Sequence, residues 1–87
     1  MIALSVDRIT AAVGGSCHGD GSVQVTAVST DSRTIPPGAL FVALRGEQHD
    51  GHDHVADAVA AGAVAVLAER AVDAPVTVRV GSTWDAL

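Results

Sequence analysis

Two short apolar runs dominate the pattern of hydrophobic and polar positions along the chain. Residues 39–44 read Ala-Leu-Phe-Val-Ala-Leu and residues 63–67 read Ala-Val-Ala-Val-Leu, with no polar side chain in either run. Runs of this length are typical of strands that are covered on both faces. The stretch from Asp53 to Ala61 has apolar residues at helical spacing and is followed by a glycine that can end a helix. Strand, helix and strand in this order predict a βαβ unit with a parallel strand pair.

The flanking segments show weaker patterns. Residues 6–13 place Val6, Ile9 and Val13 on one helical face, with Ser5 as a candidate N-cap and a glycine pair at the end. Three further strands are predicted from short alternating or apolar stretches: 16–18, 23–28 and 76–80. The Gly-Asp-Gly turn between the first two of these strands favours a hairpin. We therefore expect an α/β fold with a small mixed sheet, one βαβ unit and two to three helices.

Composition and charge narrow the function classes. The chain has 87 residues, which fits a single domain with one modest core. Hydrophobic residues make up 48% of it, yet there is one Phe, one Trp and no Tyr, so the core has to be built from Ala, Val, Ile and Leu. Ten acidic residues outnumber five basic ones, and every basic residue is an arginine. Because nucleic acids and anionic membranes are bound by clustered cations, we expect neither as a partner.

The two ends and the cysteine usage suggest a location and a boundary. The lone cysteine, Cys17, cannot form an internal disulfide, which favours a reducing compartment. The first residues lack the features of a signal peptide, and no apolar run is long enough to span a membrane, so we expect a cytoplasmic protein. Ser82 and Asp85 have the spacing of a capping box, which predicts a helix that starts just before Leu87. We therefore expect the chain to be a fragment cut at a domain boundary.

Two polar segments are candidates for chemistry because they border buried strands. In open α/β sheets, ligands bind beside the carboxyl ends of the parallel strands. Residues 46–54 follow one such strand and lead into the predicted helix, where backbone N–H groups and the helix dipole favour an anionic ligand. Residues 31–33, Asp-Ser-Arg, are typical of a side-chain-capped turn with a local ion pair. The same turn also allows Ser32 and Arg33 to face a ligand.

Residues 49–54 also suggest a metal site, since His49, His52 and His54 are interspersed with two aspartates. Their spacing matches no specific ligand motif, and segments of this kind are more often helix starts whose aspartates cap the helix. The chain contains no lysine and neither a GxGxxG nor a GxxxxGK[ST] motif, so its sequence has no phosphate cradle of the P-loop type. A metal-dependent hydrolase built on the three histidines stays open as an alternative function.

Four segments, in their order and spacing, resemble the N-terminal domain of the Mur ligase family, the ATP-dependent enzymes that build the peptide of bacterial cell-wall precursors. They are Thr-Asp-Ser-Arg at 30–33, Pro-Gly-Ala-Leu-Phe-Val-Ala-Leu-Arg-Gly-Glu at 37–47, Asp-Gly-His-Asp at 50–53 and Ala-Val-Ala-Ala-Gly-Ala at 58–63. Each segment is short, but together they are specific. The resemblance covers essentially the whole chain.

The resemblance implies that residues 1–87 form the UDP-substrate-binding domain of a three-domain ligase, whose central ATPase and C-terminal domains lie outside this chain. ATP and Mg²⁺ would serve the full-length ligase, whereas this domain is expected to bind no cofactor and to be inactive alone. Within the family, the motifs are most similar to those of the ligase that adds D-Ala-D-Ala to UDP-N-acetylmuramoyl-tripeptide (UDP-MurNAc-tripeptide) in peptidoglycan biosynthesis. The alternatives are the sister ligase that adds the third peptide residue, and a free-standing module that binds a sugar nucleotide.

The resemblance also assigns the contacts to the UDP-MurNAc-peptide. The UDP moiety is expected at two places, namely Thr30, Ser32 and Arg33, and the trio Glu47, Gln48 and His49. None of these residues would make or break a bond, because their role is to position the substrate for a distant reaction. No catalytic residue and no metal ligand is expected in this chain.

Overall fold

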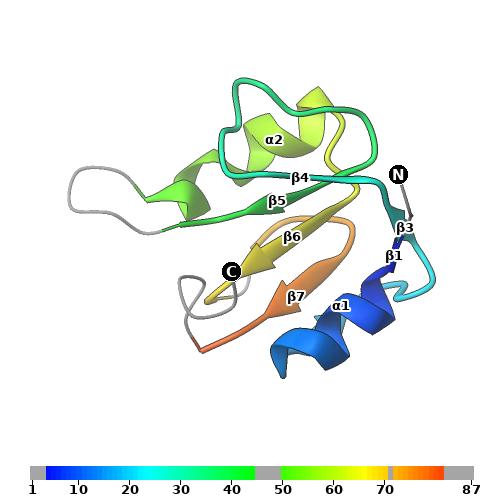
Figure 1. Cartoon of the computed structure of the whole chain (residues 1–87). Helices are drawn as coiled ribbons and strands as arrows, with labels where there is room; N and C mark the ends of the chain where they lie inside the picture. Colours follow the sequence, from blue (N-terminus) through cyan, green and yellow to red (C-terminus); the bar gives the residue numbers. More distant parts are fainter. Residues whose placement is uncertain (1–3, 45–49, 71, 82–87) are drawn as a thin grey trace.

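The computed structural model of the chain describes residues 4–44, 50–70 and 72–81. Its elements in chain order are β1 (Leu4–Ser5), α1 (Val6–Val13), β2 (Ser16–His18), β3 (Gln24–Val25), β4 (Ala27–Ser29), β5 (Ala39–Val42), the 3₁₀ helix η1 (Gly51–His54), α2 (Val55–Ala61), β6 (Ala65–Ala68) and β7 (Thr77–Arg79). The α/β fold expected from the sequence is confirmed (Figure 1).

Five strands form the main sheet, in the order β2-β7-β6-β5-β4 (Figure 1). The pairs β4–β5, β5–β6 and β6–β7 are parallel, and β2 adds an antiparallel edge beside β7. The βαβ unit predicted from the two apolar runs is β5-α2-β6, so this prediction is confirmed. A separate two-stranded sheet joins β1 to β3.

The two α-helices lie on opposite faces of the main sheet and divide the core into two layers (Figure 1). In and just after β5, Ala39, Phe41 and Ala43 pack in the layer that contains α2. Leu40 and Val42, which lie between them, pack in the layer that contains α1. Every residue of β5 and of β6 is buried. Coverage of both faces explains why these strands are continuous apolar runs rather than alternating ones.

Local capping sets the bounds of α1. The hydroxyl oxygen of Ser5 accepts a hydrogen bond from the backbone N–H of Arg8 at 3.3 Å, which caps the start of the helix. At the end, Gly14 adopts the left-handed conformation with φ 68°, and its N–H donates to the carbonyl oxygen of Thr10. The predicted helix over residues 6–13 is confirmed. The second predicted helix, over residues 53–61, begins as the 3₁₀ helix η1 and becomes α-helical only at Val55.

The predicted hairpin between residues 16–18 and 23–28 is wrong. β2 pairs instead with β7, with Cys17 opposite Val78. The segment 23–28 divides at Thr26 into β3, which pairs with β1, and β4, which pairs with β5. The physical reason is the buried strand β5, whose backbone groups need a partner on the edge away from β6, and β4 supplies it.

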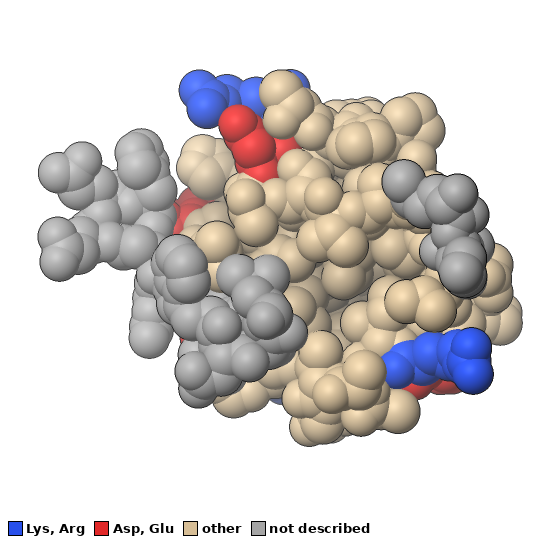
Figure 2. All heavy atoms as spheres, in the orientation of Figure 1, with Lys and Arg blue, Asp and Glu red and all other residues tan. Residues whose placement is uncertain are grey.

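Charged side chains are dispersed over the described part of the face shown in Figure 2. On the face shown in Figure 2, basic side chains lie at separate places with acidic side chains beside them, and they form no continuous patch in the described part of that face. Ion pairs join Arg33 to Asp31, and Arg70 to Asp50 and Asp53. Across residues 4–44, 50–70 and 72–81, no helix has both the length and the apolar character that crossing a membrane requires.

Phe41→Ala is expected to destabilise the fold severely. Phe41 is the largest fully buried side chain of the described core, and truncation of a buried Phe costs about 3–5 kcal/mol. Because the total stability of a small domain is roughly 5 kcal/mol, the variant is expected to be largely unfolded. Val28→Ala is the control, since Val28 is 61% exposed on the edge strand β4. Urea unfolding followed by circular dichroism measures both, and a wild-type midpoint for Phe41→Ala would contradict the described core.

Candidate functional site

The carboxyl ends of β4, β5 and β6 lie along one edge of the main sheet, because the three strands are parallel neighbours. β4 ends at Ser29, which begins a turn over residues 29–34. Among the described residues, Asp50 and η1 come after β5, while Glu69 and Arg70 come directly after β6. Polar residues from three separate segments therefore gather at the edge where α/β sheets bind ligands.

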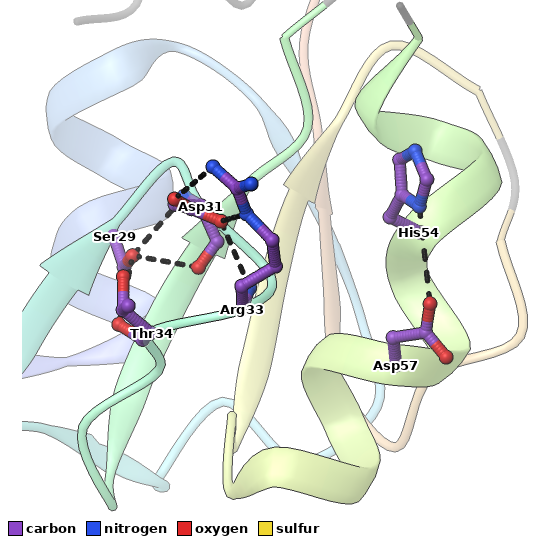
Figure 3. Close-up of polar contacts among 6 residues, drawn as sticks. All are labelled: Ser29, Asp31, Arg33, Thr34, His54 and Asp57. Carbon is purple, nitrogen blue, oxygen red and sulfur yellow. Dashed lines mark hydrogen bonds and ion pairs between the residues drawn. The ribbon is translucent and has the colours of Figure 1, made fainter.

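The turn 29–34 is held by its own polar groups (Figure 3). The Ser29 hydroxyl accepts a hydrogen bond from the Asp31 N–H at 3.2 Å and donates to the carbonyl oxygens of Asp31 and Thr34 at 3.2 and 3.5 Å. The Asp31 carboxylate accepts from the backbone N–H of Arg33 at 2.9 Å. Both of its oxygens also accept from the Arg33 guanidinium at 3.1 Å. The predicted side-chain-capped turn with a local ion pair is confirmed.

The hydroxyl groups of Thr30 and Ser32 take no part in the hydrogen bonds that hold this turn. Thr30 is exposed and Ser32 is half-buried. Within the described residues neither side chain makes a hydrogen bond. The hydrogen bonds that hold the turn are made by Ser29, Asp31 and Arg33 instead. The turn therefore presents two unused hydroxyl groups on a backbone that is already fixed. Such an arrangement suits directional recognition of a polar ligand, since each hydroxyl can both donate and accept.

The ion pair of the turn shifts both of its charged groups. Hydrogen bonds from the Arg33 side chain and backbone N–H hold the pKa of Asp31 below its usual value. The same contact raises the pKa of Arg33. Because the Arg33 side chain is 86% exposed, water screens the pair, and its main effect is on the shape of the turn. Arg33 therefore braces the turn and has little uncompensated charge to offer an anion.

Asp50 organises the start of η1. Its Oδ1 accepts a hydrogen bond from the backbone N–H of His52 at 2.9 Å, and its Oδ2 accepts from Nη1 of Arg70 at 3.0 Å. The His52 N–H, then the His52 side chain and Arg70 hold the pKa of Asp50 well below its usual range. The sequence suggested that backbone N–H groups at this helix start would bind an anionic ligand. The N–H of His52 is instead hydrogen-bonded to the carboxylate of Asp50.

The described histidines of the segment 49–54 do not form a metal centre. His52 is buried and both of its ring nitrogens are engaged, one by Asp50 and the other by the Glu69 N–H. Nδ1 of His54 lies 3.8 Å from Oδ2 of Asp57 on α2 (Figure 3). No group of three or more His, Cys, Asp or Glu side chains that could hold a metal ion is present within residues 4–44, 50–70 and 72–81.

The site residues predicted from the sequence fall into two sets. Thr30, Ser32 and Arg33 lie together in the turn at the carboxyl end of β4. The trio 47–49, which includes the third histidine of the metal hypothesis, lies outside the described residues. Sequence reasoning missed Arg70, which contacts Asp50 across twenty positions of the chain. The available signal was its place just after the second apolar run, at the carboxyl end of the next parallel strand.

A separate hollow of about 310 Å³ lies beside β2 and β7, at the side of the sheet away from β4. It is an open depression lined by Gly14, Gly15, Ser16, His18, Arg79, Val80 and Gly81. The neighbouring Cys17 is half-buried and packs against the α1 layer of the core, as expected of a small apolar side chain. The hollow shares no residue with the turn 29–34.

A small mixed sheet, covered by helices on both faces and carrying polar loops at the carboxyl ends of its parallel strands, has the architecture of an α/β ligand-binding domain. Residues 24–83 match the family described as "Mur ligase family, catalytic domain". This match spans more than half of the chain, and the chain belongs to the Mur ligase family. The resemblance inferred from the four sequence segments is thereby confirmed.

Individual relatives agree with this assignment. The chain is 51% identical over 84 residues to the UDP-N-acetylmuramoyl-tripeptide--D-alanyl-D-alanine ligase of Mycobacterium leprae, which covers 90% of this chain and 16% of that relative. It is 48% identical over 60 residues to the UDP-N-acetylmuramoyl-L-alanyl-D-glutamate--2,6-diaminopimelate ligase of Agrobacterium fabrum, with 69% and 12% covered. A crystal structure of MurF from Acinetobacter baumannii superposes with a TM-score of 0.89 at 30% identity, over 99% of this chain and 20% of that one. The chain therefore spans about a sixth of the length of the first of these relatives.

Arg33→Gln is expected to raise the pKa of Asp31 toward the usual 3.8, because the guanidinium donors are lost. Since the pKa of Asp31 is lowered in the folded state, the ion pair is complete above the usual pKa and is lost as the pH falls through the lowered one. An NMR titration of the Asp31 carboxyl carbon measures the shift. Arg79→Gln on β7 is the control and leaves the Asp31 midpoint unchanged. Equal midpoints in Arg33→Gln and wild type would contradict the pairing.

Proposed function

We propose that this chain binds the UDP part of UDP-MurNAc-tripeptide for an ATP-dependent ligase that adds D-Ala-D-Ala in peptidoglycan biosynthesis. The observation that carries the proposal is the turn 29–34, where a family motif, a self-held backbone and two unused hydroxyl groups coincide. The similarity to the Mycobacterium leprae ligase, over 90% of this chain, supports the choice of substrate.

The proposed roles follow from the contacts of the turn. Thr30 and Ser32 hydrogen-bond the uracil edge, which offers both donors and acceptors in one plane, and their hydroxyl groups can serve either. Arg33 keeps the turn in shape through its two-point contact with Asp31. The trio 47–49 forms the second part of the proposed UDP site. These residues position the substrate, so their contribution to the reaction is orientation rather than chemistry.

The bond-forming steps are assigned to other parts of a longer protein. The full sequence holds no lysine and no P-loop motif, so its donor set does not fit the triphosphate and metal of ATP. We therefore propose that residues 1–87 are the substrate-binding N-terminal domain. In this proposal, ATP and Mg²⁺ bind a central domain, and a C-terminal domain completes the ligase. The cytoplasm is the proposed location, in line with the single cysteine.

UDP is expected to bind at the turn, and the isolated chain is expected to bind it weakly because other domains contribute. Titration of UDP into the ¹⁵N-labelled chain is expected to shift the amide signals of Thr30, Ser32 and Arg33. Ser32→Ala removes one hydrogen bond and is expected to weaken binding roughly threefold to tenfold. Ser22→Ala is the control, because Ser22 lies in a different turn, after β2, where its side chain contacts Asp20. Shifts that avoid both Thr30–Arg33 and residues 47–49 at saturating UDP would refute the site.

The amino-acid substrate is tested on the longer protein that carries this chain. With UDP-MurNAc-tripeptide and ATP, phosphate release is expected to depend on D-Ala-D-Ala. The sister activity predicts dependence on a diamino acid with the shorter UDP-MurNAc-dipeptide instead, and the Agrobacterium fabrum relative makes this the comparison to run. The gene supplies an independent check, since a Gly-Lys-Thr or Gly-Lys-Ser P-loop encoded soon after Leu87 supports a ligase, whereas a stop codon supports a free-standing module.

A further inference from the structure

His52 is a buried polar residue that the proposed function leaves unused. Its side chain is 1% exposed. Nε2 accepts a hydrogen bond from the backbone N–H of Glu69 at 3.0 Å, and Nδ1 lies 2.5 Å from Oδ1 of Asp50. Because an amide N–H can only donate, Nε2 carries no proton, and the Nδ1–H group donates to Asp50. The two contacts therefore fix both the tautomer and the orientation of the ring.

These contacts join segments that are far apart in the sequence. His52 belongs to η1, which leads into α2, whereas Glu69 directly follows β6. Nη1 of Arg70 donates to the second oxygen of Asp50 at 3.0 Å. The low pKa of Asp50, caused first by the His52 N–H, keeps the carboxylate ionised at neutral pH, so all of these contacts persist. Hydrogen bonds thereby hold the start of the helical segment against the chain that follows β6.

The same short segment is also tied to the chain that follows β5. The Gly51 N–H donates to the carbonyl oxygen of Leu44 at 2.7 Å. A Cβ at position 51 would lie 2.8 Å from the backbone nitrogen of Leu44, so only glycine allows this approach. Residues 50–52 thus contact the chain after both β5 and β6, at the sheet edge that the proposed function assigns to the nucleotide.

We infer that His52 is a positioning residue for the nucleotide site at this edge. It does not contact the ligand. Through Nδ1 it orients Asp50, and through Nε2 it fixes η1 against the end of β6, which sets the place of the described segment 50–54 at this edge. The inference rests on the proposed function. A purely structural role for His52 predicts instead that every variant that stays folded binds as wild type does.

Two variants at this position separate the two bonds. In His52→Gln, the side-chain carbonyl oxygen reaches the region of Nε2 and can accept from the Glu69 N–H. In His52→Asn, the shorter amide stays near the region of Nδ1 and can donate to Asp50, but it does not reach Glu69. His54→Gln and His54→Asn are matched controls, because His54 is two residues away, exposed, and 3.8 Å from Asp57.

Two readouts need no ligand. In the wild-type chain, ¹⁵N NMR of the imidazole is expected to show the Nδ1-protonated tautomer, and the Glu69 amide is expected to exchange slowly with solvent. Slow exchange is expected to persist in His52→Gln and to be lost in His52→Asn. A ring protonated at Nε2 in the wild type, or a Glu69 amide that exchanges equally fast in all proteins, overturns the inference.

The binding readout is the affinity of the 87-residue chain for UDP, with thermal melts to confirm that each variant is folded. His52→Asn is expected to bind roughly threefold to tenfold more weakly than wild type, His52→Gln to recover most of the affinity, and the His54 variants to match wild type. Equal affinity in folded His52→Asn and His54→Asn overturns the role of His52 alone. Absence of UDP binding by the wild type overturns the proposed function, and this role with it. Where His52→Asn does not fold, reduced affinity in folded His52→Gln relative to His54→Gln supports the role, and equal affinity overturns it.

Discussion

The burial of two parallel strands on both faces is the constraint on which the rest of the structure depends. β5 and β6 are covered by α2 on one side and by α1 on the other, and all of their residues are buried. An unpaired polar group in such a strand would lose its hydration without compensation, at a cost of a few kcal/mol. Polar function is therefore confined to the ends of the strands. Because the strands are parallel, one edge of the sheet receives the carboxyl-end loops of β4, β5 and β6.

The loops at this edge are stabilised in two different ways. The turn 29–34 holds itself through bonds between residues at most five positions apart. Asp50 and His52 depend instead on partners that lie seventeen to twenty positions further along the chain. The hydrogen bonds of the first loop need no partner from a distant segment, whereas those of the second require β6 to be in place. Formation of the second loop is therefore linked to the packing of β6, whereas the hydrogen bonds within the first loop are all local.

This difference also explains what the sequence could and could not predict. Helix α1, the apolar strands and the turn after β4 depend on neighbouring residues, so spacing and residue type were sufficient to predict them. The hairpin prediction was wrong because the alternation of residues 23–28 shows which side chains are inward but not which strand lies alongside. The contact between Asp50 and Arg70 was missed for the same reason, since no local pattern relates two residues on different loops. The segment 49–54 was rich in candidate ligands, but only the fold shows that the nitrogens of His52 are already engaged.

The charges at this edge limit what it can recognise. Arg33 and Arg70 are paired, with Asp31 and Asp50 respectively, so each of these two guanidinium groups has a carboxylate within about 3 Å. A paired guanidinium attracts a distant anion weakly, because the adjacent negative charge cancels most of its field. The two unused hydroxyl groups of the turn have no such competitor. On the proposed function, the turn 29–34 therefore selects the neutral nucleoside by directed hydrogen bonds, and it supplies little of the compensation for the diphosphate charge. Under the same proposal, a chain of net charge −5 that contains no lysine can hold an anionic substrate by its neutral part.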